Sequence, residues 1–386
     1  MKDIPPVEPI LLTPGPLTTS RAVRAAMLRD WGSWDDEFRA LTRQLRADLV
    51  ALLGDGGEDY DCVPMQGSGS YLVEAMLGSF VPWHGKVLVL ANGAYGQRAA
   101  QMLDVMGLAF TLLDKGDFLP PRGDEVATAL AADPEITHVL AIHCETSSGI
   151  LNPLSEIAAA TQAAGRKLLI DSMSAFGATR IDPARLPFEA LVSSANKCLE
   201  GVPGFGFVLA RRTALAECAG NSPSLALDVH AQWASFETTG QWRFTPPTHV
   251  VAACHAALAE HAAEGGVAAR GARYAANRDR LVAGMRGLGF ETLLPEAWMS
   301  PIIVTFLSPA DPAFDFARFY AAMKARGFLI YPGKLTAVES FRIGCIGQID
   351  PEVMSRVVLA VEEALQELGV RSAAPAREAL AQRMPG

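Results

Sequence analysis

The chain has 386 residues, of which half are hydrophobic and 19% are charged, and its formal net charge is −9. This length and composition are typical of a well-packed protein with one large domain and one smaller domain. The acidic balance, without a cluster of Lys and Arg, argues against a nucleic-acid surface, and the lack of a long apolar run argues against a membrane span.

The chain begins MKDIPPVEPI, a stretch with neither an apolar core nor a small-residue cleavage site. It is therefore not expected to be a signal peptide, and we expect a cytoplasmic protein. The six cysteines form no C-x-x-C pair and are expected to be reduced thiols. His249, His255 and His261 are six residues apart, which does not give metal-ligand spacing on a helix, so no metal site is expected.

Between residue 60 and about residue 210, short apolar runs rich in branched residues alternate with helical patterns. Such runs predict buried parallel strands. They cover residues 86–91, 109–113, 137–143, 167–171, 189–195 and 205–210. Helical patterns such as 96–107 and 154–165 each end in a glycine, where a helix C-cap is expected. The alternation predicts an α/β fold with a mostly parallel sheet and helices on both faces.

The second part of the chain shows a different pattern. Two long helices are expected between residues 246 and 289, with a break at Gly265–Gly266. A smaller α+β unit then follows, with expected elements at 302–306, 315–326, 328–331, 340–345 and 351–368. We expect a large domain over 15–265, a small domain over 266–370 that includes the N-terminal segment 1–14, and a loosely held tail over 371–386.

The stretch Gly67-Ser68-Gly69-Ser70 follows a strand-like run and opens a helical pattern. Backbone N–H groups at a helix start attract an anion, glycines let a phosphate approach closely, and serine hydroxyls can donate to it. The stretch matches neither the GxGxxG dinucleotide pattern nor a GKS/T phosphate loop. On its own it is as compatible with an ordinary strand-to-helix turn as with an anion site.

Asp171 ends the run KLLID, and Lys197 follows the run EALVSSA, between small residues and glycines. Ligands of open α/β sheets bind at the carboxyl ends of strands, where both residues are expected. Alone, Asp171 could equally be a helix cap, and a single lysine is usually a solvated surface residue. Together with an anion site, the two match the needs of pyridoxal phosphate: a Schiff-base lysine, an acidic partner for the pyridine nitrogen and a phosphate site.

Eight stretches occur in order along the chain up to about residue 370: LLTPGPLTTS (11–20), QGSGSYLVEAML (66–77), ANGAYGQR (91–98), CETSSGILNP (144–153), IDSMSAFGA (170–178), SSANKCLEGVPGFGFV (193–208), FTPPTHV (244–250) and FRIGCIG (341–347). This set resembles the class-V, fold-type I aminotransferases that use pyridoxal phosphate. Within that family it is most similar to the transaminases that act on 2-aminoethylphosphonate and pyruvate. The resemblance implies a large domain with a mostly parallel, seven-stranded sheet and a smaller α+β C-terminal domain.

The resemblance also implies roles for the residues at the strand ends. Lys197 would bind pyridoxal phosphate covalently, and Asp171 would pair with its protonated pyridine nitrogen. Ser68, Gly69 and Ser70 would hold its phosphate.

Four further residues would complete the cofactor and substrate contacts of the family. Tyr95 would stack on the cofactor ring, and Thr146 would contact its hydroxyl side; without the family context they could be a core aromatic and a turn residue. Thr245 would reach the phosphate of the other subunit, which implies a two-fold homodimer, and Thr248 competes for that role. Arg342 would bind the acidic group of the substrate, although a lone arginine on a strand is usually solvated.

The implied activity is the transfer of an amino group from 2-aminoethylphosphonate to pyruvate, which yields phosphonoacetaldehyde and L-alanine. The expected partners are thus a small anionic amine and a 2-oxo acid, with no nucleic acid and no membrane. Lys334, in YPGKL, is a second candidate for the substrate's acidic group.

Three alternatives remain open at this point. One is an alanine–glyoxylate or serine–glyoxylate aminotransferase of the same class, because these enzymes share much of the framework. Another is a lyase related to cysteine desulfurases, which is disfavoured because Cys345 lies at an expected strand end and not in a late loop. The third is a non-catalytic regulator that binds the cofactor, which is disfavoured because no stretch is long and basic enough for a DNA-binding domain.

Overall fold

The protein divides into two compact units, and each is described by itself. The computed structural model describes residues 8–334 and 338–382. The larger unit comprises residues 19–145 and 151–270, and the smaller unit comprises the described residues of 1–18, 146–150 and 271–386. The domain ranges expected from the sequence stay predictions.

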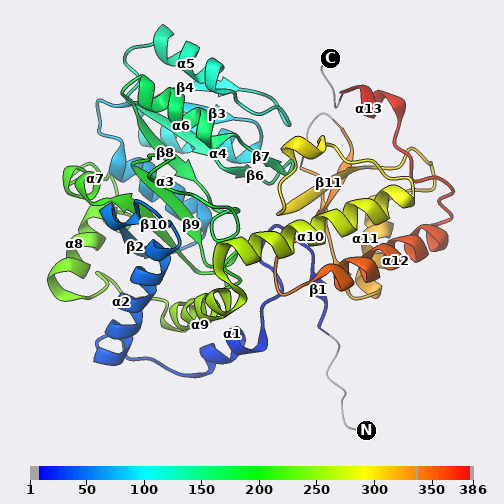
Figure 1. Cartoon of the computed structure of the whole chain (residues 1–386), viewed down its shortest axis with the longest axis horizontal. Coiled ribbons are helices and arrows are strands. Elements are labelled where there is room, and N and C mark those ends of the chain that lie inside the picture. Colours follow the sequence, from blue (N-terminus) through cyan, green and yellow to red (C-terminus); the bar gives the residue numbers. More distant parts are fainter. Residues whose placement is uncertain (1–7, 335–337, 383–386) are drawn as a thin grey trace. The chain divides into compact units, whose positions relative to one another are not determined.

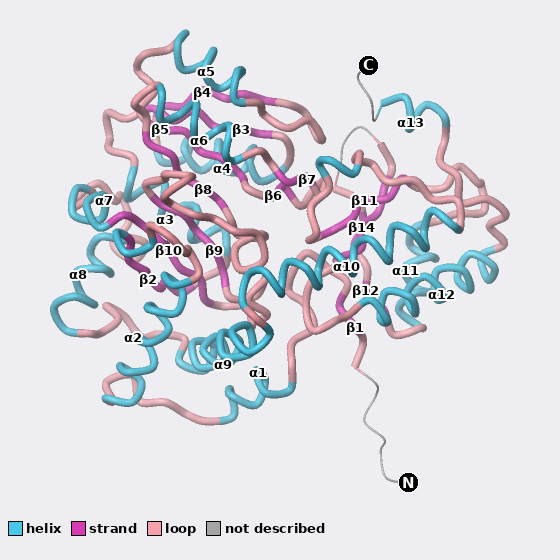
Figure 2. Tube along the Cα trace, viewed as in Figure 1, coloured by secondary structure: helices cyan, strands magenta, loops and turns pink. Residues whose placement is uncertain are grey.

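A seven-stranded sheet forms the centre of the larger unit (Figures 1 and 2). In spatial order its strands are β2 (Tyr60–Gln66), β10 (Phe205–Arg211), β9 (Ala190–Ser194), β8 (Lys167–Asp171), β5 (His138–Ile142), β3 (Lys86–Ala91) and β4 (Ala109–Asp114). The strands β9, β8, β5, β3 and β4 are parallel to one another, whereas β10 is antiparallel to both β9 and β2.

The mostly parallel sheet was expected, but the expectation that residues 205–210 form a parallel strand is wrong. The connection from β9 to β10 runs only from residue 195 to residue 204 and contains no helix. A parallel neighbour needs a crossover of a dozen or more residues, so the chain can only turn back on itself here.

The order of the strands determines which face of the sheet each connecting helix covers. The chain moves outward from β2 through β3 to β4, and then back through β5 to β8. Because crossovers between parallel strands are right-handed, α3 (Gly69–Phe80) and α4 (Ala94–Met106) cover one face, and α5 (Gly123–Ala132) and α6 (Leu154–Ala163) cover the other (Figure 1). The connections that leave β3 and β5 therefore diverge, which makes the carboxyl ends of these two strands the place where a ligand is expected to bind.

The remaining helices of the larger unit lie outside this pattern of crossovers. They are α1 (Arg21–Ala25), η1 (Ala26–Leu28), α2 (Asp36–Ala51), η2 (Gly57–Asp59), α7 (Arg212–Glu217), α8 (Val229–Thr239) and α9 (Thr248–Glu264). The helix α10 (Gly266–Gly287) follows α9 after Gly265, at the expected break. Gly265 has a φ of 112°, a conformation that favours glycine and ends α9.

The core of the larger unit consists of the strands and the helix faces that cover them. Val87, Leu88 and Val89 on β3 are completely buried, although consecutive side chains point to opposite faces of the sheet. Continuous apolar runs are thus explained by burial on both faces.

The described part of the smaller unit contains two short sheets, most of α10 and four further helical elements. The N-terminal strand β1 (Ile10–Leu11) pairs with β12 (Phe328–Leu329), and a three-stranded antiparallel sheet has the order β11 (Ile303–Leu307), β14 (Ser340–Gly344) and β13 (Tyr331–Pro332). The helical elements are η3 (Glu296–Trp298), α11 (Phe316–Ala325), α12 (Pro351–Leu368) and α13 (Arg377–Gln382). The short strands β6 (Cys144–Glu145) and β7 (Ile150–Leu151) stand where the chain passes between the units.

The C-terminal segment is held to the smaller unit by its backbone. Ala310 N donates to Ala374 O at 2.9 Å, and Arg371 N donates to the Asp311 carboxylate at 2.8 Å. The composition of this segment predicts neither contact, because both depend on the loop after β11.

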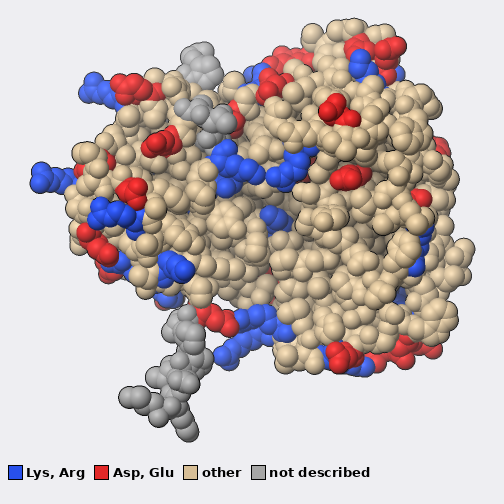
Figure 3. Space-filling model, turned by 180° about the vertical axis from the view of Figure 1, so that it is seen from behind, with Lys and Arg blue, Asp and Glu red and all other residues tan. Residues whose placement is uncertain are grey.

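Charged side chains are dispersed over the face shown in Figure 3, where small groups of both signs lie among a mostly uncharged surface. Among the residues that the structure describes, no helix combines the length and apolarity needed to span a bilayer.

Candidate active site

Asp171 and Lys197 lie at the carboxyl edge of the large sheet. Asp171 is the last residue of β8, and Lys197 is the third residue after β9, the parallel neighbour of β8. Asp171 is 7% exposed, and Lys197 is partly exposed, unlike a fully solvated surface lysine.

The surroundings of Asp171 contain groups that raise its pKa and groups that lower it. Burial raises its pKa to about 6, and the charge of Glu145 acts in the same direction. The hydrogen bond from Met173 N, 2.9 Å long, and the charges of Lys197 and Arg98 act to lower this pKa. Burial outweighs the positive charges, so the cofactor-free Asp171 carboxyl ionises less readily than a solvated one.

The glycine–serine turn at residues 67–70 has the close backbone approaches that its composition suggested. Gly67 has a φ of 122°, and a Cβ on Gly69 would lie 2.9 Å from Met173 Cγ. The backbone conformation of Gly67 favours glycine, whereas a side chain at residue 69 would require the Met173 side chain to shift, so the start of α3 lies directly beside the segment that follows Asp171. The Ser68 side chain is exposed and does not cap the helix.

Tyr95 and Arg98 lie near the start of α4, and Arg98 contacts this turn. Arg98 Nη1 donates to Ser70 Oγ at 3.1 Å, and its guanidinium carbon lies 5.1 Å from the centroid of the Tyr95 ring. Tyr95 N donates to Glu145 Oε2 at 3.0 Å, and Glu145 is fully buried. This last bond joins the segments after β3 and β5, where the topology places a ligand.

Three of the residues at this edge were not predicted: Arg98, Glu145 and His143. His143 Nδ1 lies 2.9 Å from Ser172 Oγ, and His143 N donates to Asp171 O at 2.8 Å. Burial lowers the pKa of His143 to about 4, so its ring is neutral at pH 7. Arg98 and Glu145 could have been predicted as site residues from the sequence. Arg98 is one helical turn from Tyr95, and Glu145 follows an expected strand.

Thr146 and Arg342 belong to the smaller unit and contact each other. Arg342 Nη1 donates to Thr146 O at 2.7 Å, and Arg342 Nε donates to Pro332 O at 3.0 Å. Arg342 is 5% exposed, so the alternative of a solvated strand arginine is excluded. Thr146 Oγ1 is buried without a hydrogen-bond partner in the part of the chain that the structure describes. Lys334, the second candidate, is exposed.

Thr245 lies in an exposed position in the segment before α9, and Thr248 is the first residue of that helix. Nearby, a cavity of about 610 Å³ is lined by Gly67, Tyr71 and Phe244, among others. The side chains of Tyr71 and Phe244 are 56% and 46% exposed. Exposed aromatic residues beside the glycine–serine turn are compatible with a contact to another chain.

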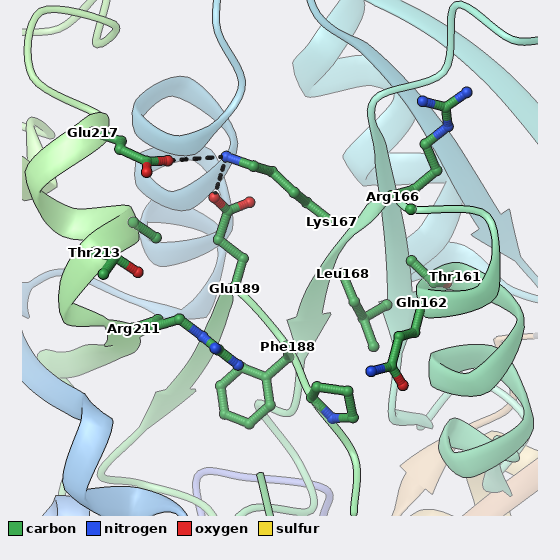
Figure 4. Close-up of a pocket in the computed structure, with 13 residues that line it drawn as sticks. Thr161, Gln162, Arg166, Lys167, Leu168, Phe188, Glu189, Arg211, Thr213 and Glu217 are labelled. Carbon is green, nitrogen blue, oxygen red and sulfur yellow. Dashed lines mark ion pairs between the residues drawn. The ribbon is translucent and has the colours of Figure 1, made fainter. Parts of the chain in front are cut away.

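A second cavity, of about 310 Å³, lies at the opposite edge of the sheet (Figure 4). Lys167, the first residue of β8, bridges Glu189 at 2.7 Å and Glu217 at 3.5 Å there. Lys167 and Asp171 are four residues apart on an extended strand, which separates them by about 13 Å. No described residue of this cavity belongs to the predicted site.

Comparison with known proteins adds to this geometry. The family model described as aminotransferase class-V matches residues 27–316. The chain belongs to the class-V aminotransferase family. Among relatives of this class-V aminotransferase, the 2-aminoethylphosphonate–pyruvate transaminase of Rhizobium meliloti (strain 1021) is 66% identical over 97% of this chain and 98% of its own length. The 2-aminoethylphosphonate–pyruvate transaminase 1 of Paraburkholderia xenovorans (strain LB400) is 63% identical over 97% of each chain.

Solved structures share the fold of this class-V aminotransferase at lower identity. The pyridoxamine–pyruvate aminotransferase of Mesorhizobium loti has a TM-score of 0.85 at 24% identity and covers 94% of this chain and 93% of its own. The alanine–glyoxylate aminotransferase of Nostoc sp. has a TM-score of 0.85 at 21% identity and covers 95% and 97%. The expected fold-type I architecture is therefore confirmed.

Proposed function

We propose that this class-V aminotransferase uses pyridoxal phosphate to transfer the amino group of 2-aminoethylphosphonate to pyruvate, which gives phosphonoacetaldehyde and L-alanine. The observation that carries this proposal is the 66% identity, over 97% of the chain, with a transaminase of that name. The lysine, carboxylate and glycine–serine turn at one edge of the sheet support the choice of cofactor, because they are the groups that it needs.

The candidate site residues fit pyridoxal phosphate, and of those described next all but Thr146 belong to the larger unit. Ser68, Gly69 and Ser70 would hold its phosphate at the start of α3, where backbone N–H groups and the helix dipole favour an anion. Arg98 would support this site, because Ser70 Oγ accepts a hydrogen bond from Arg98 at 3.1 Å and keeps its own proton to donate. Tyr95 would pack on the ring, and the buried Thr146 hydroxyl, unpartnered among the described residues, would contact the ring's hydroxyl group.

When bound, pyridoxal phosphate supplies an electron sink that lets the amine-bearing carbon of the substrate lose a proton. Lys197 would hold the cofactor through Nζ, and the same amine, when free, would move the proton that the amine-bearing carbon of the substrate gives up. Asp171 would accept a hydrogen bond from the protonated pyridine nitrogen and so keep the proton on that nitrogen. With pyruvate as the acceptor, Lys197 would move the proton in the opposite direction.

Arg342 would bind the phosphonate of the amino donor and the carboxylate of pyruvate in turn. A guanidinium can grip either anion through two parallel N–H bonds. Its hydrogen bonds to the carbonyls of Thr146 and Pro332 hold the side chain in place, which preorganises it for a ligand.

The two-fold homodimer, with Thr245 of one chain directed to the phosphate site of the other, also remains a proposal. The exposure of Thr245, Tyr71 and Phe244 beside the glycine–serine turn supports it. Residence in the cytoplasm is proposed from the sequence alone.

We expect 2-aminoethylphosphonate with pyruvate to give the highest kcat/KM in a panel that pairs it, L-alanine and L-serine with pyruvate and with glyoxylate. Arg342→Lys should lower kcat/KM for both half-reactions by roughly ten- to a hundredfold, because it keeps the charge and loses the paired N–H fork. Lys334→Ala is the control and should leave kcat/KM unchanged for both half-reactions. If L-serine or L-alanine with glyoxylate gives the highest value, the glyoxylate aminotransferase alternative replaces the proposal.

Arg98→Met is expected to lower the affinity of the cofactor-free enzyme for pyridoxal phosphate by roughly ten- to a hundredfold, the effect of one lost hydrogen bond from a charged group. Its affinity for pyridoxal, which has no phosphate, should not change. Gln97→Met is a matched control, because Gln97 lies on the same helix and its amide bonds the Asp114 carboxylate at 2.8 Å. An equal loss of affinity for pyridoxal phosphate and for pyridoxal would indicate that Arg98 packs against Tyr95 and does not support the phosphate site.

A further inference from the structure

Arg270, the fifth residue of α10, has the largest almost completely buried side chain among the described residues, with 2% exposure. A guanidinium is removed from water only at a high free-energy cost, so it must be paired and hydrogen-bonded. Arg270 Nε contacts Glu264 Oε2 at 2.6 Å, and Arg270 Nη1 lies 3.4 Å from Glu200 Oε1. Arg270 Nη1 also donates to Cys198 O at 2.6 Å.

Two of these partners belong to the turn that begins at Lys197. Glu200 N donates to Lys197 O at 2.8 Å, which closes the turn, and Gly201 N donates to Ala195 O at 2.7 Å. Glu200 has a φ of 61°, and among the described residues it is the one non-glycine residue with a positive φ. This conformation is strained for a residue with a side chain and persists only where surrounding contacts enforce it.

The other side of the turn is also fixed. Cys198 Sγ donates to Ser174 O at 3.0 Å, and a Cβ on Gly177 would lie 2.7 Å from Leu199 Cδ2. Both contacts come from the segment that follows Asp171. The turn is therefore held between that segment and Arg270, and Lys197 is its first residue.

We propose that Arg270 is a positioning residue for Lys197: it binds the Cys198 carbonyl and the Glu200 carboxylate, and so fixes the turn that presents the Lys197 amine. The proposal rests on the proposed role of Lys197. A planar guanidinium can serve three acceptors in different directions, whereas a lysine ammonium at this position is a single point of charge. Displacing a reacting group by about 1 Å can cost about a hundredfold in rate, so a small shift of this turn matters.

The test compares Arg270→Met and Arg270→Lys with Arg273→Met. Arg273 is the matched control, because it lies on the same helix and donates to two carbonyls, of Gly347 and Ile349, at 2.7 Å within the smaller unit. Amide hydrogen exchange of residues 195–201 is measured on the full chain with and without pyridoxal phosphate. The kcat and KM for 2-aminoethylphosphonate are measured on the cofactor-loaded enzyme.

Arg270→Met should speed exchange within residues 195–201 by about tenfold or more and lower kcat by about a hundredfold, with little change in KM. Arg270→Lys should give intermediate values, and Arg273→Met should leave both quantities at wild-type values. Unchanged exchange and kcat in Arg270→Met would overturn the proposal, and so would a uniform rise of exchange over the whole chain.

If Arg270→Met does not fold, Glu200→Gln takes its place, because it removes the charge and keeps the size of the side chain. It should lower kcat with KM unchanged, and wild-type kcat would overturn the proposal. Failure of the underlying function is distinguishable, since borohydride would then fix the cofactor on a lysine other than Lys197 in the wild-type enzyme.

Discussion

Asp171→Asn is expected to lower kcat by roughly a hundred- to a thousandfold, because a neutral amide no longer favours the protonated pyridine nitrogen of the cofactor. Pyridoxal phosphate should remain bound, since the glycine–serine turn and Lys197 are unchanged. Single-turnover absorbance measurements with 2-aminoethylphosphonate would report the rate of proton transfer. A turnover close to that of the wild type would refute the role proposed for Asp171.

The same variant is expected to stabilise the cofactor-free chain at pH 8. The pKa of Asp171 is raised by burial from 3.8 to about 6, so the folded chain binds a proton more tightly than the unfolded chain does. Between these two values the free energy of unfolding falls as pH rises, and above pH 6 the whole penalty is present, which amounts to about 3 kcal/mol. Asparagine removes this penalty and keeps an oxygen that can accept the hydrogen bond from Met173 N.

Urea unfolding of the cofactor-free wild type and variant at pH 8 and pH 4 would measure this effect. The variant should gain up to about 3 kcal/mol at pH 8, and the gain should disappear near pH 4. Asp182→Asn is the control, because Asp182 is also 7% exposed but has Arg180 at 3.5 Å and Arg185 at 3.8 Å. It should not stabilise the chain. A loss of stability in Asp171→Asn at pH 8 would contradict the account of this buried charge.

Lys197→Ala is expected to fold and to lose turnover by about 10⁴-fold or more, since the residue supplies both the covalent link to the cofactor and the proton transfer. Borohydride reduction of the wild type should fix pyridoxal phosphate on Lys197, and peptide mapping would locate it.

Lys167→Ala is the matched control for this experiment, because Lys167 stands at the opposite end of β8, where it bridges Glu189 and Glu217. It should retain both turnover and the label. A label on a lysine other than Lys197 would refute the mechanism.

The order of strands and helices was predictable from the sequence because burial on both faces of a parallel sheet leaves continuous apolar runs. The run KVLVLA coincides with β3, and the glycine pair at 265–266 separates α9 from α10. The direction of β10 was predicted incorrectly, because the apolar run of a buried strand is the same in either direction. Its antiparallel course follows from the short connection before it.

The site was predictable only where residues follow strand ends or match a motif. Asp171 and Lys197 were found in this way. The contact between Arg98 and Ser70 depends on how α4 packs beside α3, and the contacts of Arg270 join residues 198 and 264 through a buried turn. Such contacts between segments distant in the sequence leave no local pattern.

The most direct test of the proposed function is a half-reaction on the cofactor-loaded enzyme with 2-aminoethylphosphonate and no pyruvate. The account predicts one equivalent of phosphonoacetaldehyde per chain, formed in the wild type and not in Lys197→Ala, and L-alanine released only when pyruvate is then added. A wild-type enzyme that forms no aldehyde, while L-serine or L-alanine converts the cofactor to its amine form, would contradict it.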